Sequence, residues 1–398
     1  MKIEGGTVTT PRGFQSGGVA AGIKGEGKLD LGLLSSVVPC AAAGVFTTNV
    51  VRAAPVLLSQ QHLRSGVAQA VVANSGCANA CTGEAGMEDA HEMARLVATK
   101  LGLSPQSVVV ASTGVIGHPL PMEKIGAGIE QVDLSTGGGH RFAEAILTTD
   151  RGPKEVAFAF NVDGRAITIG GVAKGAGMIH PNLATMLIFL TTDAPVEIGF
   201  LRHSLQLAAE TSFNMLTVDG DTSTNDSVFI LANGEAGGAV LDGSTPGSAE
   251  FQRALELTCI ELSKAIVRGA EGASKLIEVI VDGAQSTEDA RQIARTIAGS
   301  SLVKTAVHGN DPNWGRILAA AGRSGVTFAP EKADVYIGEL KVMQAGRPLS
   351  FDWQQGIAQL DREEVVLRLA LNHGPASAVA WGCNLSEEYV TINSAYTT

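Results

Sequence analysis

Short apolar runs bounded by turn residues predict several buried strands along this chain. Runs of roughly four to eight apolar residues between such boundaries are typical of strands inside a core. We expect strands at Ala68–Ala73, Ser107–Val110, Val156–Phe160, Ala166–Gly170, Thr185–Leu190, Val228–Ala232 and Leu276–Val281. The pair Asp163-Gly164, between the third and fourth of these, predicts a hairpin turn because both residues tolerate positive φ.

Apolar residues three and four positions apart predict helices in three segments. Met87–Leu101 carries one apolar face, and Ala249–Val267 carries a longer one. Thr287–Ala298 follows Ser286, and Asp289 lies three residues after that serine, in the spacing of a capping box. Strands and helices alternate loosely, with hairpins among them. The fold class is therefore a layered α/β or α+β sandwich rather than a helix bundle or a β-barrel.

Composition and charge narrow the class of function. The chain has 398 residues, of which 45% are hydrophobic, and its 48 glycines follow no Gly-X-Y period, which excludes a disordered or collagen-like chain. With 29 Lys and Arg against 40 Asp and Glu, no overall basic field attracts nucleic acid. The start lacks a signal-peptide core, and the apolar runs fall far short of the ~20 residues of a membrane span. We therefore expect a cytoplasmic protein with neither a nucleic-acid nor a membrane partner.

Cysteine and aspartate clusters give no metal signature. The five cysteines are odd in number and are expected to be reduced thiols. Cys77 and Cys81 are spaced C-x3-C, but no second pair nearby completes a zinc site. Asp219, Asp221 and Asp226 cluster in DGDTSTND, whose spacing misses that of a calcium loop. We expect no metal and no resident cofactor, and we interpret DGDTSTND and HGNDPNWGR as loops that shape or support a site.

The most unusual stretch is Gly170–Ala194, with the sequence GGVAKGAGMIHPNLATMLIFLTTDA. Glycines flank Lys174, so the backbone there can approach a ligand with an ammonium group at hand. A phosphate-binding loop is excluded, because GGVAKGAG does not match G-x-x-x-x-G-K-[ST] and a predicted strand follows in place of a helix. Taken alone, such a loop is more often a glycine-rich turn with a solvated lysine than a binding site.

Thr185 gives the same stretch a second interpretation. A threonine hydroxyl is a weak nucleophile without a base, and no Ser, His and Asp set is spaced around this one. Cleavage of the Ala184–Thr185 bond would give Thr185 an α-amine with a pKa of ~8, able to act as base for its own hydroxyl. The small Ala184 would leave room for an N-to-O acyl shift. A threonine that begins a buried strand is more often only a strand former, so these residues alone leave both interpretations open.

The sequence GGVAKGAGMIHPNLATML resembles the self-cleavage signature of the ornithine acetyltransferase (glutamate N-acetyltransferase) family of arginine biosynthesis. Further segments match this family in the same order, so the resemblance covers essentially the full chain. They are ANSGCANACTG (73–83), ASTGVIG (111–117), LTTD (147–150), DGDTSTND (219–226), RGAEGASKLIEV (268–279), VKTAVHGNDPNWGR (303–316) and YVTINSAYTT (389–398). The visible departure is Ser394-Ala395, where the family is expected to have Ala-Asp.

This resemblance implies a self-processing N-terminal-nucleophile fold of the DmpA and ArgJ group. It implies self-cleavage between Ala184 and Thr185, which gives an α chain of residues 1–184 and a β chain of residues 185–398. We expect the two chains to share one core rather than to form independent domains. The family also implies an α2β2 heterotetramer.

The resemblance also assigns site residues one by one. It makes Thr185 the nucleophile and implies an oxyanion hole at Thr113 and Gly114, where a hydroxyl and a backbone N–H face the developing charge. The implied substrate-binding residues are Thr148 (or Thr149, one position on), Lys174, Thr185, Glu271, Asn393 and Thr398. Lys174 suits a substrate carboxylate, and Glu271 suits an amino-acid ammonium. The family mechanism assigns no base among His118, His180 and His308, which we expect to be structural.

The implied reaction moves the acetyl group of N2-acetyl-L-ornithine to L-glutamate through an acetyl-Thr185 intermediate, with ping-pong kinetics. Some family members also use acetyl-CoA as a co-substrate and are bifunctional. None of the residues named here indicates whether this chain does so. An N-terminal-nucleophile amidase or aminopeptidase would share the cleavage but release the acyl group to water. A specialised acetyltransferase of secondary metabolism and a non-catalytic amino-acid-binding protein on the same scaffold also remain open.

Overall fold

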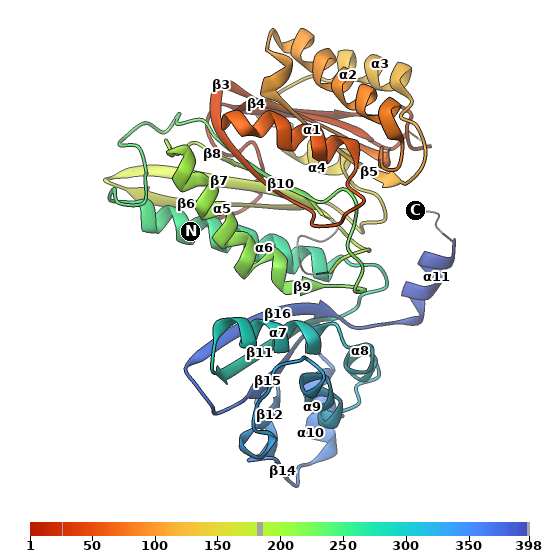
Figure 1. Ribbon diagram of the computed structural model, residues 1–398, viewed down its shortest axis with the longest axis vertical. Helices are drawn as coiled ribbons and strands as arrows, with labels where there is room; N and C mark the ends of the chain where they lie inside the picture. Colours follow the sequence, from red (N-terminus) through yellow and green to blue (C-terminus); the bar gives the residue numbers. More distant parts are fainter. Residues whose placement is uncertain (26, 181–185, 396–398) are drawn as a thin grey trace.

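The computed structural model describes residues 1–25, 27–180 and 186–395, and two β-sheets organise them (Figure 1). Within these ranges the larger sheet has nine strands. In sheet order they are β1 (Lys2–Ile3), β6 (Lys154–Val162), β7 (Arg165–Lys174), β8 (Leu187–Thr192), β10 (Ser227–Ala232), β3 (Leu31–Phe46), β4 (Val67–Cys77) and β5 (Val108–Val115), with β2 (Phe14–Val19) beside β3. Parallel and antiparallel neighbours are mixed, because β10 pairs in parallel with β8 and antiparallel with β3.

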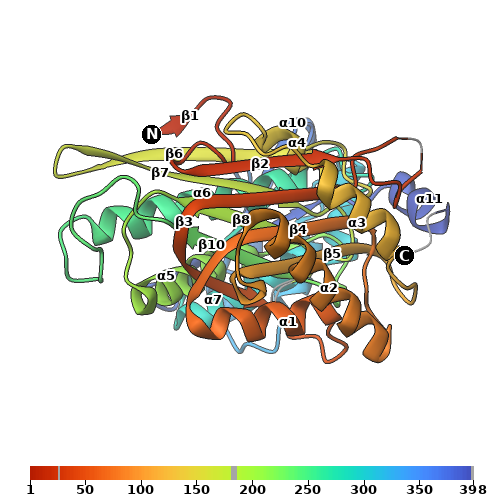
Figure 2. The same cartoon turned by 90° about the horizontal axis from the view of Figure 1, so that it is seen from above.

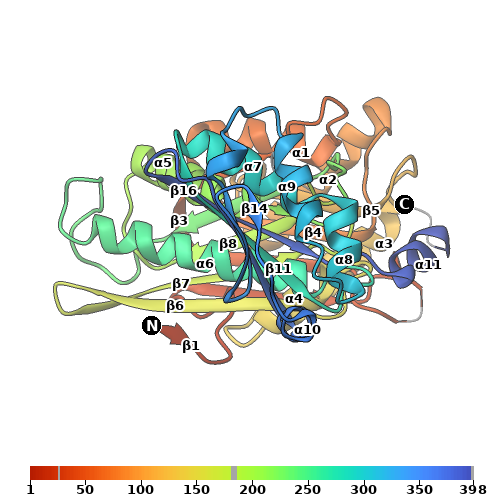
Figure 3. The same cartoon turned by 90° about the horizontal axis from the view of Figure 1, so that it is seen from below.

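The smaller sheet is built from the C-terminal part of the chain. As described, its strands in order are β14 (Arg347–Pro348), β13 (Leu340–Gln344), β12 (Asp334–Ile337), β15 (Glu364–Ala370), β11 (Leu276–Ala284), β16 (Ala376–Cys383) and β9 (Leu216–Thr217). Seen from below, β11 and β16 run across the direction of β6 and β7 (Figure 3). The two sheets therefore form separate layers of one layered α/β fold, the class expected from the sequence.

Helices cover both sheets. On the larger sheet, α1 (Ala54–His62), α2 (Gly83–Leu101) and α3 (Met122–Gln131) pack on one face of β3, β4 and β5, and α4 (Gly139–Ala145) packs on the other (Figure 2). The layer between the sheets holds α5 (Ile198–Thr211) and α6 (Ser248–Arg268). Beside the smaller sheet lie α7 (Thr287–Ala298), α8 (Ser301–His308), α9 (Trp314–Gly322) and α10 (Trp353–Leu360). Short 3-10 turns occur at η1 (Leu63–Ser65), η2 (Pro105–Ser107), η3 (Phe213–Met215) and η4 (Pro330–Lys332).

The C-terminal helix α11 (Glu387–Ala395) stands apart from both layers. Figures 1 and 2 both place it near the end of β5, at the side of the molecule. None of its described side chains is buried. Across the described ranges, no helix combines the length and the apolar character needed to cross a membrane.

The predicted elements are largely confirmed, with shifts at their ends. The Asp163-Gly164 turn joins β6 and β7, and both residues have positive φ, +49° and +79°. The helix α7 begins after Ser286, whose side chain accepts a hydrogen bond from Asp289 N (3.1 Å). Ser107 was wrongly included in a strand: it ends η2, since a proline two residues earlier favours a tight turn. The predicted strand Thr185–Leu190 appears as β8, and Thr185 itself lies outside the described residues.

The long strand β3 was not predicted from the sequence, because polar residues and a proline interrupt its apolar run. Its first half pairs with β2 and β4, and its second half pairs with β10. The pairing with β4 is irregular between Ser35 and Cys40, where Pro39 has no backbone N–H to donate. One strand thus links the two halves of the larger sheet.

Both sides of the proposed cleavage point contribute to the same core. The strand β7 pairs with β8, so that Gly171 lies opposite Leu190. Ile169 from β7 and Leu190 from β8 belong to a large apolar cluster that also includes Ile277 of the smaller sheet. The other face of β8 points Leu187 and Phe189 into a second cluster. The division into chains 1–184 and 185–398 stays a prediction, because its boundary lies outside the described residues.

Candidate active site

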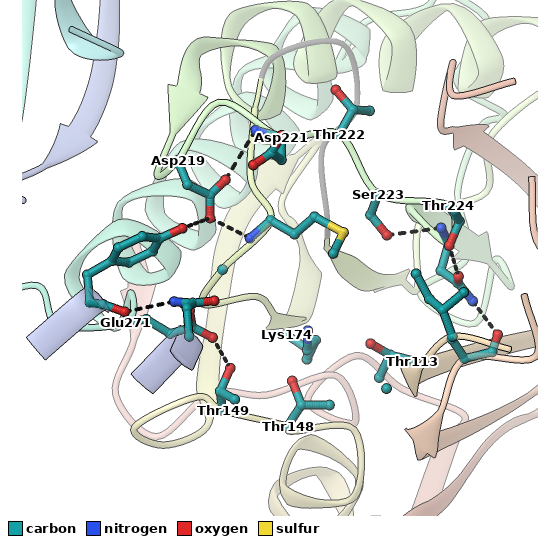
Figure 4. A pocket seen from close by; sticks show the side chains of 18 residues that line it. Thr113, Thr148, Thr149, Lys174, Asp219, Asp221, Thr222, Ser223, Thr224 and Glu271 are labelled. Atoms are coloured by element: carbon teal, nitrogen blue, oxygen red, sulfur yellow. Dashed lines mark hydrogen bonds between the residues drawn. The ribbon is translucent and has the colours of Figure 1, made fainter. Parts of the chain in front are cut away.

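A cavity of about 380 Å³ opens where the ends of β5 and β7, the loop before β10 and α11 come together (Figure 4). It gathers predicted site residues from widely separated parts of the sequence. Those that line it are Thr113, Gly114, Thr148, Thr149, Lys174, Glu271 and Asn393. Ala184, Thr185 and Thr398 are also predicted site residues, but they lie outside the described residues.

The proposed oxyanion hole lies at the end of β5, beside β4. Gly114 has φ +130°, a conformation that side chains rarely adopt. A Cβ atom built there would stand 2.3 Å from the carbonyl carbon of Gly76 and 2.5 Å from Cys77 N. Both constraints require glycine, and they place a backbone N–H and the Thr113 side chain together at the cavity wall.

A buried lysine forms a second part of the wall. Lys174 ends β7 and is only 4% exposed. Burial lowers the pKa of its ammonium, and the nearby Asp150 carboxylate acts against this effect. Asp150 is itself buried, forms an ion pair with Lys154 and accepts a hydrogen bond from Gly175 N (2.8 Å). Burial acts to raise the pKa of Asp150, but the two lysines outweigh it and hold that pKa below its ordinary value. One carboxylate between two lysines leaves positive charge available for a ligand anion.

Glu271 supplies negative charge on another side of the cavity. It is 7% exposed and accepts hydrogen bonds from Thr149 Oγ1 (2.5 Å) and Asn393 Nδ2 (2.8 Å). A Cβ atom at Gly177 would lie 2.4 Å from the Glu271 carboxylate, so the glycine-rich loop lets this carboxylate approach the backbone. Thr148 also lines the cavity, and its backbone N–H donates to Asp150 Oδ2 (3.1 Å). The structure therefore joins Thr149, the alternative assignment, directly to Glu271.

The loop DGDTSTND forms the remaining wall, as its sequence predicted. Asp219 accepts hydrogen bonds from Met178 N (2.6 Å), Ile179 N (2.8 Å) and the Tyr389 hydroxyl (3.2 Å). Burial and the neighbouring Asp219 raise the pKa of Tyr389, which keeps its hydroxyl protonated as a donor. The sequence analysis assigned Tyr389 no role. The one available signal was its position as the first residue of YVTINSAYTT, a segment that matches the family. Asp219 thus ties α11 to the glycine-rich loop.

The second polar loop does not reach the cavity. HGNDPNWGR joins α8 to α9, where Asn310 bonds Lys275 and, through its amide (3.1 Å), Asp361. His308 lies at the start of this loop and contacts Asn384 (2.9 Å), while His180 contacts Thr217 (3.3 Å). We assign this loop a role in the smaller-sheet layer rather than in the site.

Cysteines and acidic groups are dispersed through the part of the chain that the structure describes. Four of the five cysteines are buried, Cys81 is exposed, and all five are free. Within that part no three His, Cys, Asp or Glu side chains are grouped so that they could hold a metal ion.

Together, the fold and the cavity define a class of protein. A layered α/β scaffold presents backbone and hydroxyl donors, an ammonium and a carboxylate to one small cavity, an arrangement complementary to a small molecule that carries both an anion and a cation. This arrangement is that of an enzyme acting on amino-acid-like molecules.

Comparisons with known proteins agree with this class and identify the family. The model of the ArgJ family matches residues 15–398. The arginine biosynthesis bifunctional protein ArgJ of Dehalococcoides mccartyi is 54% identical over 395 residues, covering 99% of this chain and 98% of that protein. The protein of the same name from Symbiobacterium thermophilum is 54% identical over 405 residues, with both chains fully covered. The chain belongs to the ArgJ family.

Solved structures include relatives that match part of the chain. A crystal structure of the arginine biosynthesis bifunctional protein ArgJ from Bacillus halodurans is 44% identical, with a TM-score of 0.45, and covers 46% of this chain and 96% of its own. The ornithine acetyltransferase of Mycobacterium tuberculosis, solved in complex with ornithine, is 46% identical, with a TM-score of 0.43, and covers 46% of this chain and 97% of its own.

Proposed function

We propose that this protein is a glutamate N-acetyltransferase that moves the acetyl group of N2-acetyl-L-ornithine to L-glutamate in arginine biosynthesis. The observation that carries the proposal is the convergence of Thr113, Lys174, Glu271 and Asn393, from four distant segments, on one cavity of about 380 Å³. The names of the relatives at 54% identity, arginine biosynthesis bifunctional proteins, support the same reaction.

The first chemical step is self-cleavage. Thr185 Oγ attacks the carbonyl carbon of Ala184, and the carbon–nitrogen bond breaks as the Thr185 nitrogen takes up a proton. Water then hydrolyses the resulting ester, which leaves a carboxylate on Ala184 and both a free amine and a free hydroxyl on Thr185. The pairing of β7 with β8 supports the prediction that both chains stay in one core after this cut.

The second step is acetyl transfer. The Thr185 hydroxyl attacks the acetyl carbonyl of acetylornithine while the α-amine of the same residue accepts the proton. Thr113 and Gly114 donate hydrogen bonds to the oxyanion that forms. The ornithine amine leaves with the proton, and acetyl-Thr185 remains. The amine of glutamate then attacks this ester by the reverse sequence and releases free Thr185.

Substrate orientation follows from the charges around the cavity. Lys174 pairs with a carboxylate of the substrate, which both acetylornithine and glutamate possess. Glu271, oriented by Thr149 and Asn393, binds an ammonium group. Acetylornithine uses both charges, with its carboxylate at Lys174 and its side-chain ammonium at Glu271. Glutamate is held through a carboxylate at Lys174, so that its one amine is free to attack the acetyl group. Thr148 and the C-terminal Thr398 complete the binding residues of the proposal.

Assembly and location complete the proposal. We assign an α2β2 heterotetramer in the cytoplasm, no resident cofactor, and acetyl-CoA as a second acetyl donor in a bifunctional enzyme. Formation of N-acetylglutamate from glutamate with acetyl-CoA as the single acetyl donor tests the second donor. Light scattering of the purified protein tests the assembly.

The decisive experiment on processing is the intact mass of the purified protein under denaturing conditions, with N-terminal sequencing. We expect two chains of roughly 19 and 22 kDa, in proportion to their lengths within 41.0 kDa, the second beginning Thr-Met-Leu-Ile. A single chain of 41.0 kDa with no activity on acetylornithine would remove the proposed base and leave a binding protein.

A second measurement separates transfer from hydrolysis. We expect ornithine release from acetylornithine to depend on glutamate and to match the formation of N-acetylglutamate. Release of acetate at a rate that ignores glutamate would instead identify an amidase with the same nucleophile.

A further inference from the structure

The loop before β10 ends in two buried polar residues, Asn225 and Asp226. Asn225 is 6% exposed, and its Nδ2 donates hydrogen bonds to the carbonyl oxygens of Ala78 (2.6 Å) and Ser112 (2.8 Å). Ser112 directly precedes Thr113. The Asn225 side chain therefore fixes the end of β5 that carries the proposed oxyanion hole.

Asp226 binds a different part of the chain. Its Oδ1 accepts a hydrogen bond from Met186 N (2.9 Å), and the next residue, Ser227, donates its N–H to Met186 O (3.1 Å). Met186 is the residue directly after Thr185 in the sequence. The Asp226 main-chain oxygen accepts a hydrogen bond from Thr47 N (3.0 Å), which anchors Asp226 to the end of β3.

A carboxyl group at this position is costly for the fold. Asp226 is 1% exposed, and its Oδ2 has no hydrogen-bond partner in the described part of the chain. Burial raises the pKa of this carboxyl well above its ordinary value, and the Met186 N–H, the charge of Lys174 and hydrogen bonds from Ser223 oppose the rise. The hydrogen bond from Met186 N to Asp226 Oδ1 therefore joins this buried carboxyl to the start of β8.

We propose that Asn225 and Asp226 are positioning residues that hold Met186, the residue after the proposed nucleophile Thr185 in the sequence, at a fixed place relative to the oxyanion hole at Thr113 and Gly114. Cα atoms of adjacent residues lie about 3.8 Å apart. One peptide unit therefore couples the anchor of the oxyanion strand to the anchor of Met186. This assignment rests on the proposed function and extends it to residues that make and break no bonds themselves.

The test uses two single variants of the full chain, Asp226→Ala and Asn225→Ala. Each variant loses one anchor, so Met186 and the end of β5 are no longer held at a fixed separation. We expect kcat for acetyl transfer to fall on the order of 100-fold while KM for acetylornithine changes little, because reacting groups misplaced by about 1 Å lose rate rather than binding. We also expect uncleaved precursor to accumulate in both variants, as measured by intact mass.

Two comparisons separate positioning from general stability. Asp226→Asn keeps an oxygen acceptor for Met186 N and is expected to recover most of the kcat lost in Asp226→Ala. Asn233→Ala is a matched control, because Asn233 follows the far end of β10 and its amide likewise joins two segments, at Arg12 O (2.8 Å) and Ser36 Oγ (3.3 Å). This control is expected to keep the wild-type kcat.

Defined results overturn the assignment. Wild-type cleavage and kcat in both alanine variants would do so, as would an equal loss of kcat in Asn233→Ala. If Asp226→Ala does not fold, Asp226→Val replaces it with the same expected loss, since valine suits the start of a strand. A wild-type protein that cleaves but transfers no acetyl group contradicts the proposed function, while the cleavage readout still decides the positioning role. A wild type that neither cleaves nor transfers overturns both.

Discussion

At Gly114, conformation and packing independently exclude a side chain. The positive φ of +130° disfavours any Cβ, and the 2.3 Å approach to Gly76 leaves no space for one. Lys174 and Glu271 are also constrained by their surroundings. Each is a buried charged group that lines the cavity, where a substrate group of opposite charge can pair with it. The chemistry of the site is therefore concentrated in a few residues whose surroundings constrain them closely.

Gly114→Ala tests the oxyanion hole at the residue scale. We expect kcat to fall about 100- to 1,000-fold, because the new Cβ displaces the backbone N–H that donates to the oxyanion. Steady-state kinetics with acetylornithine and glutamate measures the effect. Gly126→Ala in α3, where a Cβ meets only Leu96 at 3.7 Å, is the control and should keep its activity. Equal kcat values for Gly114→Ala and wild type would contradict the assignment.

Lys174 predicts a pH dependence of substrate binding. Its ammonium is present below the lowered pKa and is lost as the pH rises through that pKa. We therefore expect KM for acetylornithine to rise with pH before the ordinary lysine range of about 10.4 is reached. Lys174→Met should raise KM on the order of 10- to 100-fold and remove this pH dependence, because a charge-assisted hydrogen bond contributes about 1.5–3 kcal/mol. Lys100→Met, in α2 and outside the cavity lining, should behave as wild type. A flat wild-type profile would argue against the role of Lys174.

At the scale of elements, the site depends on how loops and a terminal helix meet the ends of strands. The glycine-rich loop after β7 and the loop before β10 meet at Asp219, which bonds backbone groups of the first and the hydroxyl of Tyr389 in α11. Although α11 buries none of its described side chains fully, the half-buried Tyr389 ring packs against the large apolar cluster, and Tyr389 and Asn393 form hydrogen bonds at the cavity. Its placement therefore responds to single hydrogen bonds.

Tyr389→Phe tests this dependence. The change removes the hydroxyl that donates to Asp219 Oδ2 (3.2 Å) and keeps the ring. We expect KM to rise roughly two- to tenfold, as the loss of about 0.5–1.5 kcal/mol implies, with little change in melting temperature. Val390→Ala, at a position 63% exposed on the same helix, should leave KM unchanged. An unaltered KM in Tyr389→Phe would show that the hydroxyl does not hold α11.

At the scale of the whole molecule, one apolar cluster joins the two sheets and both sides of the proposed cut. It includes Ile169 before the cut, Ile188 and Leu190 after it, and Ile277 from the smaller sheet. Most of this cluster comes from residues after the cut, and β7 and neighbouring segments before the cut pack into it. The two chains should therefore behave as one folding unit.

This arrangement predicts joint unfolding of the cleaved protein. We expect the chains to elute together in native buffer, to separate only in denaturant, and to unfold in a single calorimetric transition. Calorimetry and size-exclusion chromatography of the purified protein provide the measurement. Two resolved transitions, or a free chain of roughly 19 kDa in native buffer, would show that the chains fold separately.

Elements whose signals are local could be predicted from the order of the amino acids alone. Periodicity along α2, α6 and α7 and the Asp163-Gly164 turn depend on neighbours a few residues apart, so the pattern was sufficient. The resemblance likewise pointed to Thr113, Lys174, Glu271 and Asn393 before any geometry was known. The path of β3 could not be predicted in this way, since its partners lie far along the chain and Pro39 breaks its pattern.

The side-chain contacts of the site depend on how distant segments pack together. Thr149 rather than Thr148 donates to Glu271, Tyr389 reaches Asp219 across 170 residues, and HGNDPNWGR stays outside the cavity. In the sequence, Asn225 and Asp226 are recognisable only as part of a polar loop. Their hydrogen bonds to Ser112 O in β5 and from Met186 N are visible only in the structure. The physical reason is that hydrogen bonds and burial depend on distances in space, which segments remote in sequence set by packing together.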